Sequence, residues 1–310
     1  MCLGTGALHG YLGDNMADWL IEWLELSQVL GISHFHITNG TAWVSSRMRQ
    51  LLNYYEESGI VSIAQHPPPV ENYKEAERAI GRDVADVAKR TALHDCFYSN
   101  MYRYEYIASL DLDEVIVPTT ESTYKGLLGK VKACTKCKGE KPTQVYRSHM
   151  FCQYKEPSEM IGNVTNSNNV TTHDTISPEQ SLKSNSTDSD NNSMVDNKET
   201  SNDDEIQLML EERDSFNEMK GWDMRKVMMN PRLCVFAWTH GCLKAVKNAP
   251  MNVKDGHGAF VHHYRSECDI KRFAHHTADK DKYTKDKRIQ KYMPEVRERV
   301  DSIRLQLGFD

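Results

Sequence analysis

Residues 106–118 read YIASLDLDEVIVP, an apolar segment interrupted by three carboxylates. The first part, YIASL, predicts a buried β-strand, and Asp111 and Asp113 follow its carboxyl end. If the strand continues, a spacing of two places both carboxylates on one face and turns Leu112 into the core. Clustered carboxylates near a core are costly unless a cation neutralises them, and oxygen ligands favour Mg²⁺ or Mn²⁺ over Zn²⁺. The stretch therefore favours a divalent metal site over an acidic turn that simply faces solvent.

Helices and strands alternate ahead of this segment. Apolar residues at helical spacing and β-rich runs bounded by glycine or proline define the elements. Helices are expected at about 15–30, 46–58 and 83–103, and strands at 32–38, 60–65 and 106–110. This alternation predicts a parallel α/β sheet, in which ligands bind beyond the carboxyl ends of the strands. Asn39 and the acidic segment both lie at such ends.

The pattern stops after Tyr154. Residues 157–205 contain no Phe, Trp, Tyr, Cys or Ala, and they carry ten acidic residues against two lysines. Such a segment buries too little apolar surface to offset its ordering entropy, so we predict an acidic, disordered insertion at 157–215. Residues 1–156 and 216–310 are then the two ordered parts. In the second part, strands are expected at 232–238 and 259–265 and a helix at about 285–307.

Charge and cysteine content limit the class of protein. The net charge of −6 and the lack of a basic block argue against nucleic-acid binding. Without the segment 157–205, the net charge of the rest of the chain is near +2, which suits an anionic substrate. No apolar run is long enough to span a membrane, and the start does not read as a signal peptide.

Eight cysteines and five Asn-x-Ser/Thr sites point toward the secretory pathway, in which case a targeting segment is expected upstream of Met1. Cys96 is expected to be a buried free thiol. Disulfides are expected among Cys134, Cys137, Cys152, Cys234, Cys242 and Cys268.

A longer segment around the acidic residues resembles a known family. HDCFYSNMYRYEYIASLDLDEVIVP (94–118) closely resembles the signature xxDCxYxNxxxxxxVxxxDxDEhhhP (h apolar) of glycosyltransferase family 92. Four other stretches agree with that family: CLGTGALHG at the start, LGISHFHITNG (30–40), RKVMMNP (225–231) and AFVHHYR (259–265). The acidic insertion and the Thr38-Asn39-Gly40 sequence, where relatives commonly have a Tyr-Asp-Asn-like sequence, depart from it.

The resemblance implies a GT-A-like (Rossmann-like) α/β fold, with a mixed, mainly parallel sheet flanked by helices. It also implies a UDP-sugar donor, Mn²⁺ or Mg²⁺, a glycan or glycoprotein acceptor, and galactose transfer with inversion. Relatives are anchored to the Golgi membrane and act in its lumen, through an N-terminal anchor that this sequence lacks. Residues 1–156 would then bind the nucleotide-sugar, and residues 216–310 would form the acceptor side.

The resemblance also implies roles for the acidic residues. Asp113 is expected to bind the metal directly, and Asp111 to bind the donor ribose, the metal or its water shell. His262 and His263 face opposite ways in a strand, and His263 is the expected further metal ligand. Glu114 either supports the site from behind or faces solvent.

Four further residues are expected to contact the donor. Asn39 would meet the nucleotide, Arg90 and Asp95 the base or ribose, and Arg265 the diphosphate. Each also has an alternative without a donor role. Asn39 could be an ordinary turn residue, Arg90 and Asp95 an ordinary helical charge pair, and Arg265 an ordinary surface arginine. An inverting reaction also needs a general base, which the sequence does not identify, although Glu156 and Asp255 are suitable carboxylates.

Two other functions fit the sequence less well. DLDEVIV also resembles the start of the haloacid-dehalogenase-like phosphohydrolases, in which the first Asp is the nucleophile and the second the acid/base. Those enzymes place the motif on the first strand, whereas two expected strands precede it here, and the adjacent acids Asp203 and Asp204 fall in the insertion. A catalytically inactive, glycan-binding relative is the other alternative.

Overall fold

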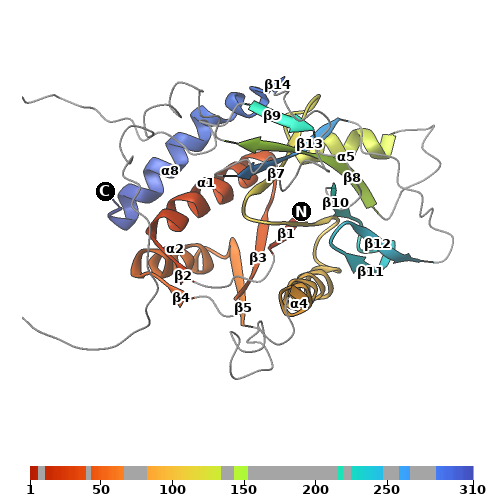
Figure 1. Ribbon diagram of the computed structural model, residues 1–310, viewed down its shortest axis with the longest axis horizontal. Helices are drawn as coiled ribbons and strands as arrows, with labels where there is room; N and C mark the ends of the chain where they lie inside the picture. Colours follow the sequence, from red (N-terminus) through yellow and green to blue (C-terminus); the bar gives the residue numbers. More distant parts are fainter. Residues whose placement is uncertain are drawn as a thin grey trace, which may run out of the picture. The chain divides into compact units, whose positions relative to one another are not determined.

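A mixed β-sheet forms the centre of the computed structural model (Figure 1). The structure describes residues 1–5, 11–39, 43–65, 82–133, 143–152, 215–218, 225–246, 258–265 and 284–309. These residues all belong to one compact unit, Met1–Tyr154 with Gln207–Asp310. The insertion expected at 157–215 lies outside the described residues, apart from Ser215.

Four parallel strands make up the first half of the sheet. β1 (Cys2–Thr5) lies between β3 (His34–Asn39) and β6 (Ile107–Leu110), and β5 (Val61–Gln65) pairs with β3 at the edge. All four carboxyl ends therefore meet at one edge, so Asn39 and Asp111 lie at the same edge, separated by β1.

Antiparallel pairing extends the sheet beyond β6. β10 (Arg225–Met229) runs antiparallel to both β6 and β8 (Thr143–Cys152). β13 (Ala259–Arg265) pairs in parallel with β8 and antiparallel with β7 (Glu114–Pro118). The remaining strands of this side are β9 (Ser215–Glu218) and β14 (Thr284–Lys285). The family resemblance implies a mixed, mainly parallel sheet flanked by helices, and this fold class is confirmed.

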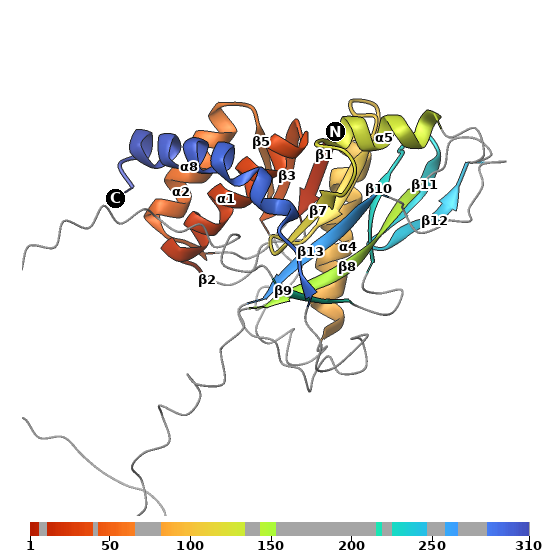
Figure 2. The same cartoon turned by 90° about the horizontal axis from the view of Figure 1, so that it is seen from above.

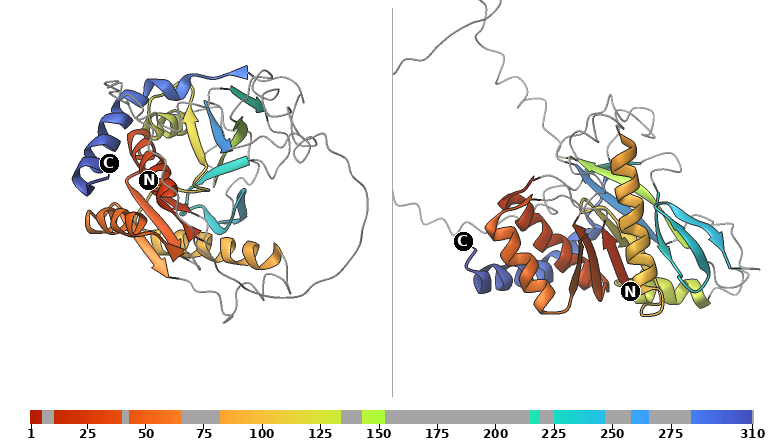
Figure 3. Two further views of the ribbon diagram at one scale, coloured as in Figure 1. Left: turned by 60° about the vertical axis from the view of Figure 1, so that its left-hand side comes forward. Right: turned by 90° about the horizontal axis from the view of Figure 1, so that it is seen from below.

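Helices cover both faces of the parallel half. Leu3 of β1 belongs to the core formed with α1 (Asp14–Leu30), α2 (Ser46–Glu57) and α8 (Met293–Leu307), while Cys2 faces the core formed with α4 (Arg82–Asn100). Figures 2 and 3 show α1, α2 and α8 gathered on one side of β1 and β3 and α4 on the other.

Smaller elements complete the described part of the chain. They are β2 (Tyr11–Leu12), β4 (Trp43–Val44), α5 (Tyr124–Ala133), β11 (Cys234–Trp238), β12 (Gly241–Ala245) and the 3-10 helix η2 (Arg288–Lys291). A disulfide joins Cys234 to Cys242 across the β11–β12 ribbon. Among the described helices, none is both long and apolar enough to cross a membrane.

The elements expected before residue 111 are confirmed to within a few residues, although the two-residue strands β2 and β4 were not expected. The sequence did not predict β1, although it is the central parallel strand, so the strand that ends at Leu110 follows three strands of the sheet rather than two. The C-terminal helix begins at Met293 rather than near 285, because β14 and η2 occupy the preceding residues and Pro294 fits only the first turn of α8.

The expected cysteine chemistry is confirmed for the described residues. Cys234 and Cys242, two of the six cysteines expected to form disulfides, are bonded to each other, and Cys96 is a buried free thiol. Cys134, Cys137 and Cys268 lie outside the described residues, as does the side chain of Cys152 at the end of β8, so the disulfides expected of these four stay a prediction.

Candidate active site

The acidic segment forms a turn rather than a continuing strand. β6 ends at Leu110, β7 begins at Glu114, and the Glu114 amide donates to the Asp111 carbonyl at 3.0 Å. The expectation that Asp111 and Asp113 share one face of a strand is therefore wrong. The reason is that the chain must change direction here, since β7 pairs with β13 and not with a neighbour of β6.

Two tryptophans of α1 hold this turn in place through hydrogen bonds to its backbone. The Trp19 indole N–H donates to the Leu112 carbonyl at 2.7 Å, and the Trp23 indole N–H donates to the Glu114 carbonyl at 2.9 Å. Both rings are buried, so each indole N–H is satisfied by a backbone carbonyl of the segment 112–114. The apolar stripe of the first helix thus positions the acidic side chains.

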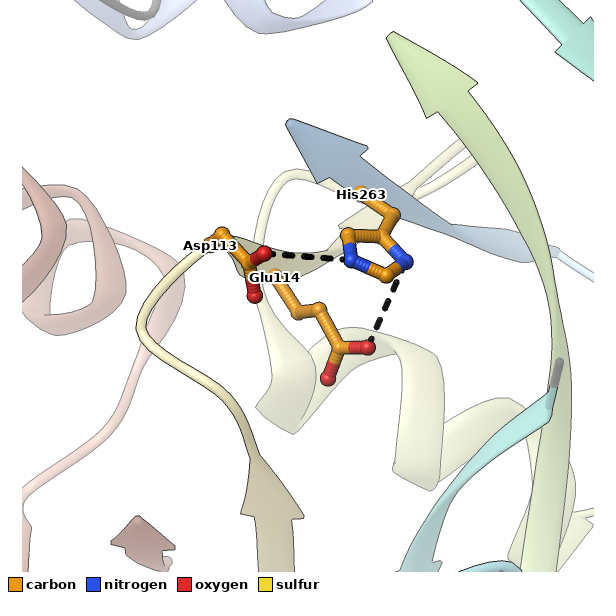
Figure 4. A group of neighbouring side chains, drawn as sticks. All are labelled: Asp113, Glu114 and His263. Carbon is orange, nitrogen blue, oxygen red and sulfur yellow. Dashed lines mark hydrogen bonds and ion pairs between the residues drawn. The ribbon is translucent and has the colours of Figure 1, made fainter. Parts of the chain in front are cut away.

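Asp113, Glu114 and His263 gather into a compact cluster (Figure 4). His263 lies opposite Glu114 in the β7–β13 register, and the Tyr264 amide donates to the Asp113 carbonyl at 2.7 Å. His263 Nε2 is 3.2 Å from Asp113 Oδ2, and its Nδ1 is 3.6 Å from Glu114 Oε1. One ligand atom from each residue lies within 4.8 Å of the others. Two carboxylates and an imidazole at this spacing fit a divalent cation.

Two lysines hold Asp111 beside this cluster. Lys89 Nζ and Lys226 Nζ lie 2.7 and 3.0 Å from the same oxygen, Asp111 Oδ2. Lys226 Nζ is also 2.6 Å from Glu114 Oε2, and the Asp111 amide donates to that oxygen at 2.9 Å. Lys226 therefore bridges Asp111 and Glu114, while Lys89 approaches Asp111 from α4.

These contacts keep both partners charged. Burial alone would raise the pKa of Asp111, but Lys226 and Lys89 hold that pKa well below its usual range. Burial alone would lower the pKa of Lys226, but Glu114 and Asp111 raise it above the usual lysine value. Asp111 is therefore a carboxylate at any working pH.

His262 has a different environment from its neighbour His263. It is fully buried, with Nδ1 3.0 Å from the Tyr264 hydroxyl and Nε2 3.4 Å from Asp286 Oδ2. Burial lowers the pKa of His262, and the contact with Asp286 opposes that effect. Its partner on the chain segment before η2 indicates that His262 ties β13 to the C-terminal part of the fold.

In the structure, the residues that were expected to bind the donor interact with other groups of the protein. Asn39 donates to Gln65 Oε1 at 3.0 Å and borders a pocket of ≈ 200 Å³ on the α2 side of β3. Asp95 Oδ2 lies 2.6 Å from His36 Nε2. The exposed Arg90 guanidinium stacks over the Trp238 ring, 4.4 Å from its centroid.

The donor roles given to Asn39, Arg90, Asp95 and Arg265 stay predictions. Arg265 is the last residue of β13, and the part of the chain that the structure describes does not include its side chain. The carboxylates suggested for a general base, Glu156 and Asp255, lie outside the described residues.

Sequence reasoning missed Lys89 and Lys226. Lys226 stands in RKVMMNP, one of the stretches that carry the family resemblance, and a lysine at the start of an apolar strand is a signal that could have pointed to an acidic partner. Lys89 precedes Arg90 on α4, and nothing in its local sequence separates it from an ordinary surface lysine.

Comparison with known proteins identifies the family to which the chain belongs. The family described as Glycosyltransferase family 92 matches residues 11–300, nearly the whole chain. A search of curated proteins found no match.

Several solved glycosyltransferase structures resemble parts of the fold. One is the galactosyltransferase LgtC in complex with donor and acceptor sugar analogs, at 14% identity over 48% of this chain and 46% of that one, with a TM-score of 0.26. An active-site mutant of LgtC matches at 12% identity over 49% and 46%, with a TM-score of 0.22. The apo structure of the bifunctional enzyme WbbM matches at 12% identity over 47% and 23%, with a TM-score of 0.22. The matched region spans less than half of each of these proteins.

Proposed function

Because the chain belongs to glycosyltransferase family 92, we propose that it transfers a hexose, most readily galactose, from a UDP-sugar to a glycan acceptor with inversion. Membership of this family shows that the protein is a glycosyltransferase. The identity of the donor, the need for a metal and the stereochemistry belong to the proposal. The observation that carries it is the cluster of Asp113, Glu114 and His263 beside Asp111 at the carboxyl edge of the parallel strands.

Asp113 and His263 are the proposed metal ligands, with Mn²⁺ or Mg²⁺ as the ion. Glu114 is buried and lies between His263 and Lys226, so it orients the imidazole and is available as a third ligand. The ion, when bound, neutralises the charge that develops on the departing diphosphate. Asp111 Oδ2 is held by two lysines, which favours a contact with the ribose or the water shell over direct metal binding.

Location and acceptor are part of the same proposal. The five Asn-x-Ser/Thr sites and the Cys234–Cys242 disulfide support an oxidising compartment, and we propose the Golgi lumen. A glycan or a glycoprotein is the proposed acceptor.

The direct test measures UDP release and sugar transfer with purified protein, UDP-galactose and Mn²⁺. Asp113→Ala should abolish both, whereas Asp301→Ala, an exposed aspartate on α8, should leave both unchanged. Other UDP-hexoses in parallel identify the donor, and p-nitrophenyl phosphate tests phosphohydrolysis, which we expect to be absent.

The outcomes separate the claims. A wild-type protein that binds no UDP-sugar in the presence of Mn²⁺ contradicts the proposal. Binding without turnover would indicate an inactive relative. Full activity of Asp113→Ala would remove that residue from the metal site but leave the family assignment intact.

A further inference from the structure

Lys89 and Lys226 neutralise the same carboxylate oxygen but differ in what else they can reach. Both Nζ atoms lie within 3.0 Å of Asp111 Oδ2. The Lys226 side chain is only 5% exposed and has a second carboxylate, Glu114, at 2.6 Å. The Lys89 side chain is 34% exposed. Lys226 is therefore enclosed, while Lys89 stands at the surface of the site.

Because Asp111 contacts two lysines, it does not depend on Lys89 alone to neutralise its charge. The Asp111 side chain is 32% exposed, and a part-buried charge that is left without any partner costs stability. If Lys89 moves away, however, Asp111 keeps Lys226 at 3.0 Å and is not left alone. Lys89 can thus change partner at little cost to the rest of the site, and Lys226 cannot.

The chemistry and the position of Lys89 indicate which kind of ligand it would bind. A lysine ammonium is a compact point charge with three donors, which suits phosphate oxygens, and its flexible stem lets it reorient. Lys89 meets the acidic turn that also carries Asp113, where the proposed donor would place its diphosphate. Exposed Arg90 follows it near the middle of α4 and adds a second positive charge to this part of the helix, although its guanidinium lies over the Trp238 ring.

We propose that Lys89 binds the donor diphosphate by exchanging Asp111 for the phosphate oxygens. This inference rests on the proposed function, because it requires a nucleoside diphosphate at the acidic turn. Lys226 stays with Asp111 and Glu114 throughout. The exchange also frees one side of Asp111 Oδ2, which can then meet the ribose or the water shell.

The test compares the affinity for UDP with the affinity for uridine, by calorimetry with Mn²⁺ and again without it. Lys89→Met should weaken UDP binding about 10- to 100-fold, the range of a charged hydrogen bond, and leave uridine binding unchanged. Lys89→Arg should restore part of the UDP affinity. Lys132→Met is the matched control, because Lys132 is 39% exposed and pairs with a single carboxylate, Glu105, away from the turn.

Three results would overturn the inference. If Lys89→Met binds UDP as tightly as wild type, Lys89 does not bind the diphosphate. If it loses UDP and uridine affinity equally, Lys89 acts on the nucleoside or on the fold. If wild type itself binds no UDP, the proposed function fails and the inference fails with it, a result distinct from the first two.

Discussion

Lys226 and Glu114 form a buried ion pair, with 2.6 Å between Nζ and Oε2 and side-chain exposures of 5% and 2%. The pair joins β10 to the first residue of β7, and Asp111 shares its lysine. Removing one partner of such a pair leaves an uncompensated charge in the interior, which costs far more than the intact pair contributes.

Lys226→Met should therefore lower the free energy of unfolding by about 3–5 kcal/mol, measured by urea denaturation. Combining it with Glu114→Gln should recover part of the loss, because the second change removes the stranded carboxylate. Lys132→Met, at an exposed ion pair, should cost less than about 1 kcal/mol. A Lys226→Met protein as stable as wild type would contradict the role of Lys226 as the buried counter-charge.

Metal affinity should separate the members of the acidic cluster. Asp113→Asn and His263→Ala remove proposed ligands and should weaken Mn²⁺ binding by more than about 100-fold. Glu114→Gln, which alters the group that orients His263, should weaken it by about 10- to 100-fold. Titration followed by the Mn²⁺ electron paramagnetic resonance signal measures this, with Asp301→Asn as control. Unchanged affinity in Asp113→Asn would place the metal elsewhere.

The Tyr55 hydroxyl predicts a loss of stability at high pH. It donates to Glu25 Oε1 at 2.6 Å, and burial together with Glu25 raises the pKa of Tyr55 well above its usual value. A raised pKa in the folded state means that this stabilisation is complete below about pH 10 and is lost as the pH rises further. Between pH 10 and 12, stability should fall about 1.4 kcal/mol per pH unit more steeply in wild type than in Tyr55→Phe. Parallel curves from denaturation at a series of pH values would exclude this role.

Gly4 is needed because α4 approaches β1 closely. A Cβ added at Gly4 would lie 2.5 Å from Cys96 Sγ and 2.9 Å from Cys96 Cβ. Gly4→Ala should therefore cost about 1–3 kcal/mol in unfolding free energy, and Cys96→Ala should rescue part of it by removing the sulfur. Gly129→Ala in α5 has no atom within 4 Å of the new Cβ and should be neutral or stabilising by up to about 1 kcal/mol. Thermal unfolding compares the four proteins.

Periodicity was a reliable guide where an element is long and half-buried. The stripe that carries Trp19 and Trp23 predicted α1, and strand alternation predicted that His262 and His263 would have different surroundings. The placement of Asn39 and Asp111 at one edge followed from parallel pairing alone.

The remaining features depend on contacts between distant residues. β1 is four residues long and contains Gly4, so its local sequence is weak, and its identity as the central strand comes from pairing with both β3 and β6. The turn at Asp111 is set by β13, which comes about 150 residues later. No local sequence pattern predicts that Lys89 and Lys226 meet at one carboxylate. The packing of α4 and β10 in the folded protein brings them together.

The insertion of β13 between β7 and β8 also determines when the site can form during synthesis. Asp113 and His263 are separated by 150 residues, so the cluster stays incomplete until most of the chain has left the ribosome. Until then, β7 presents an unpaired edge, and a nascent chain that ends before residue 259 holds the acidic turn without its histidine. Binding of Mn²⁺ at the proposed site would therefore report that β13 has paired with β7, and a chain stalled earlier would be exposed to edge-to-edge association.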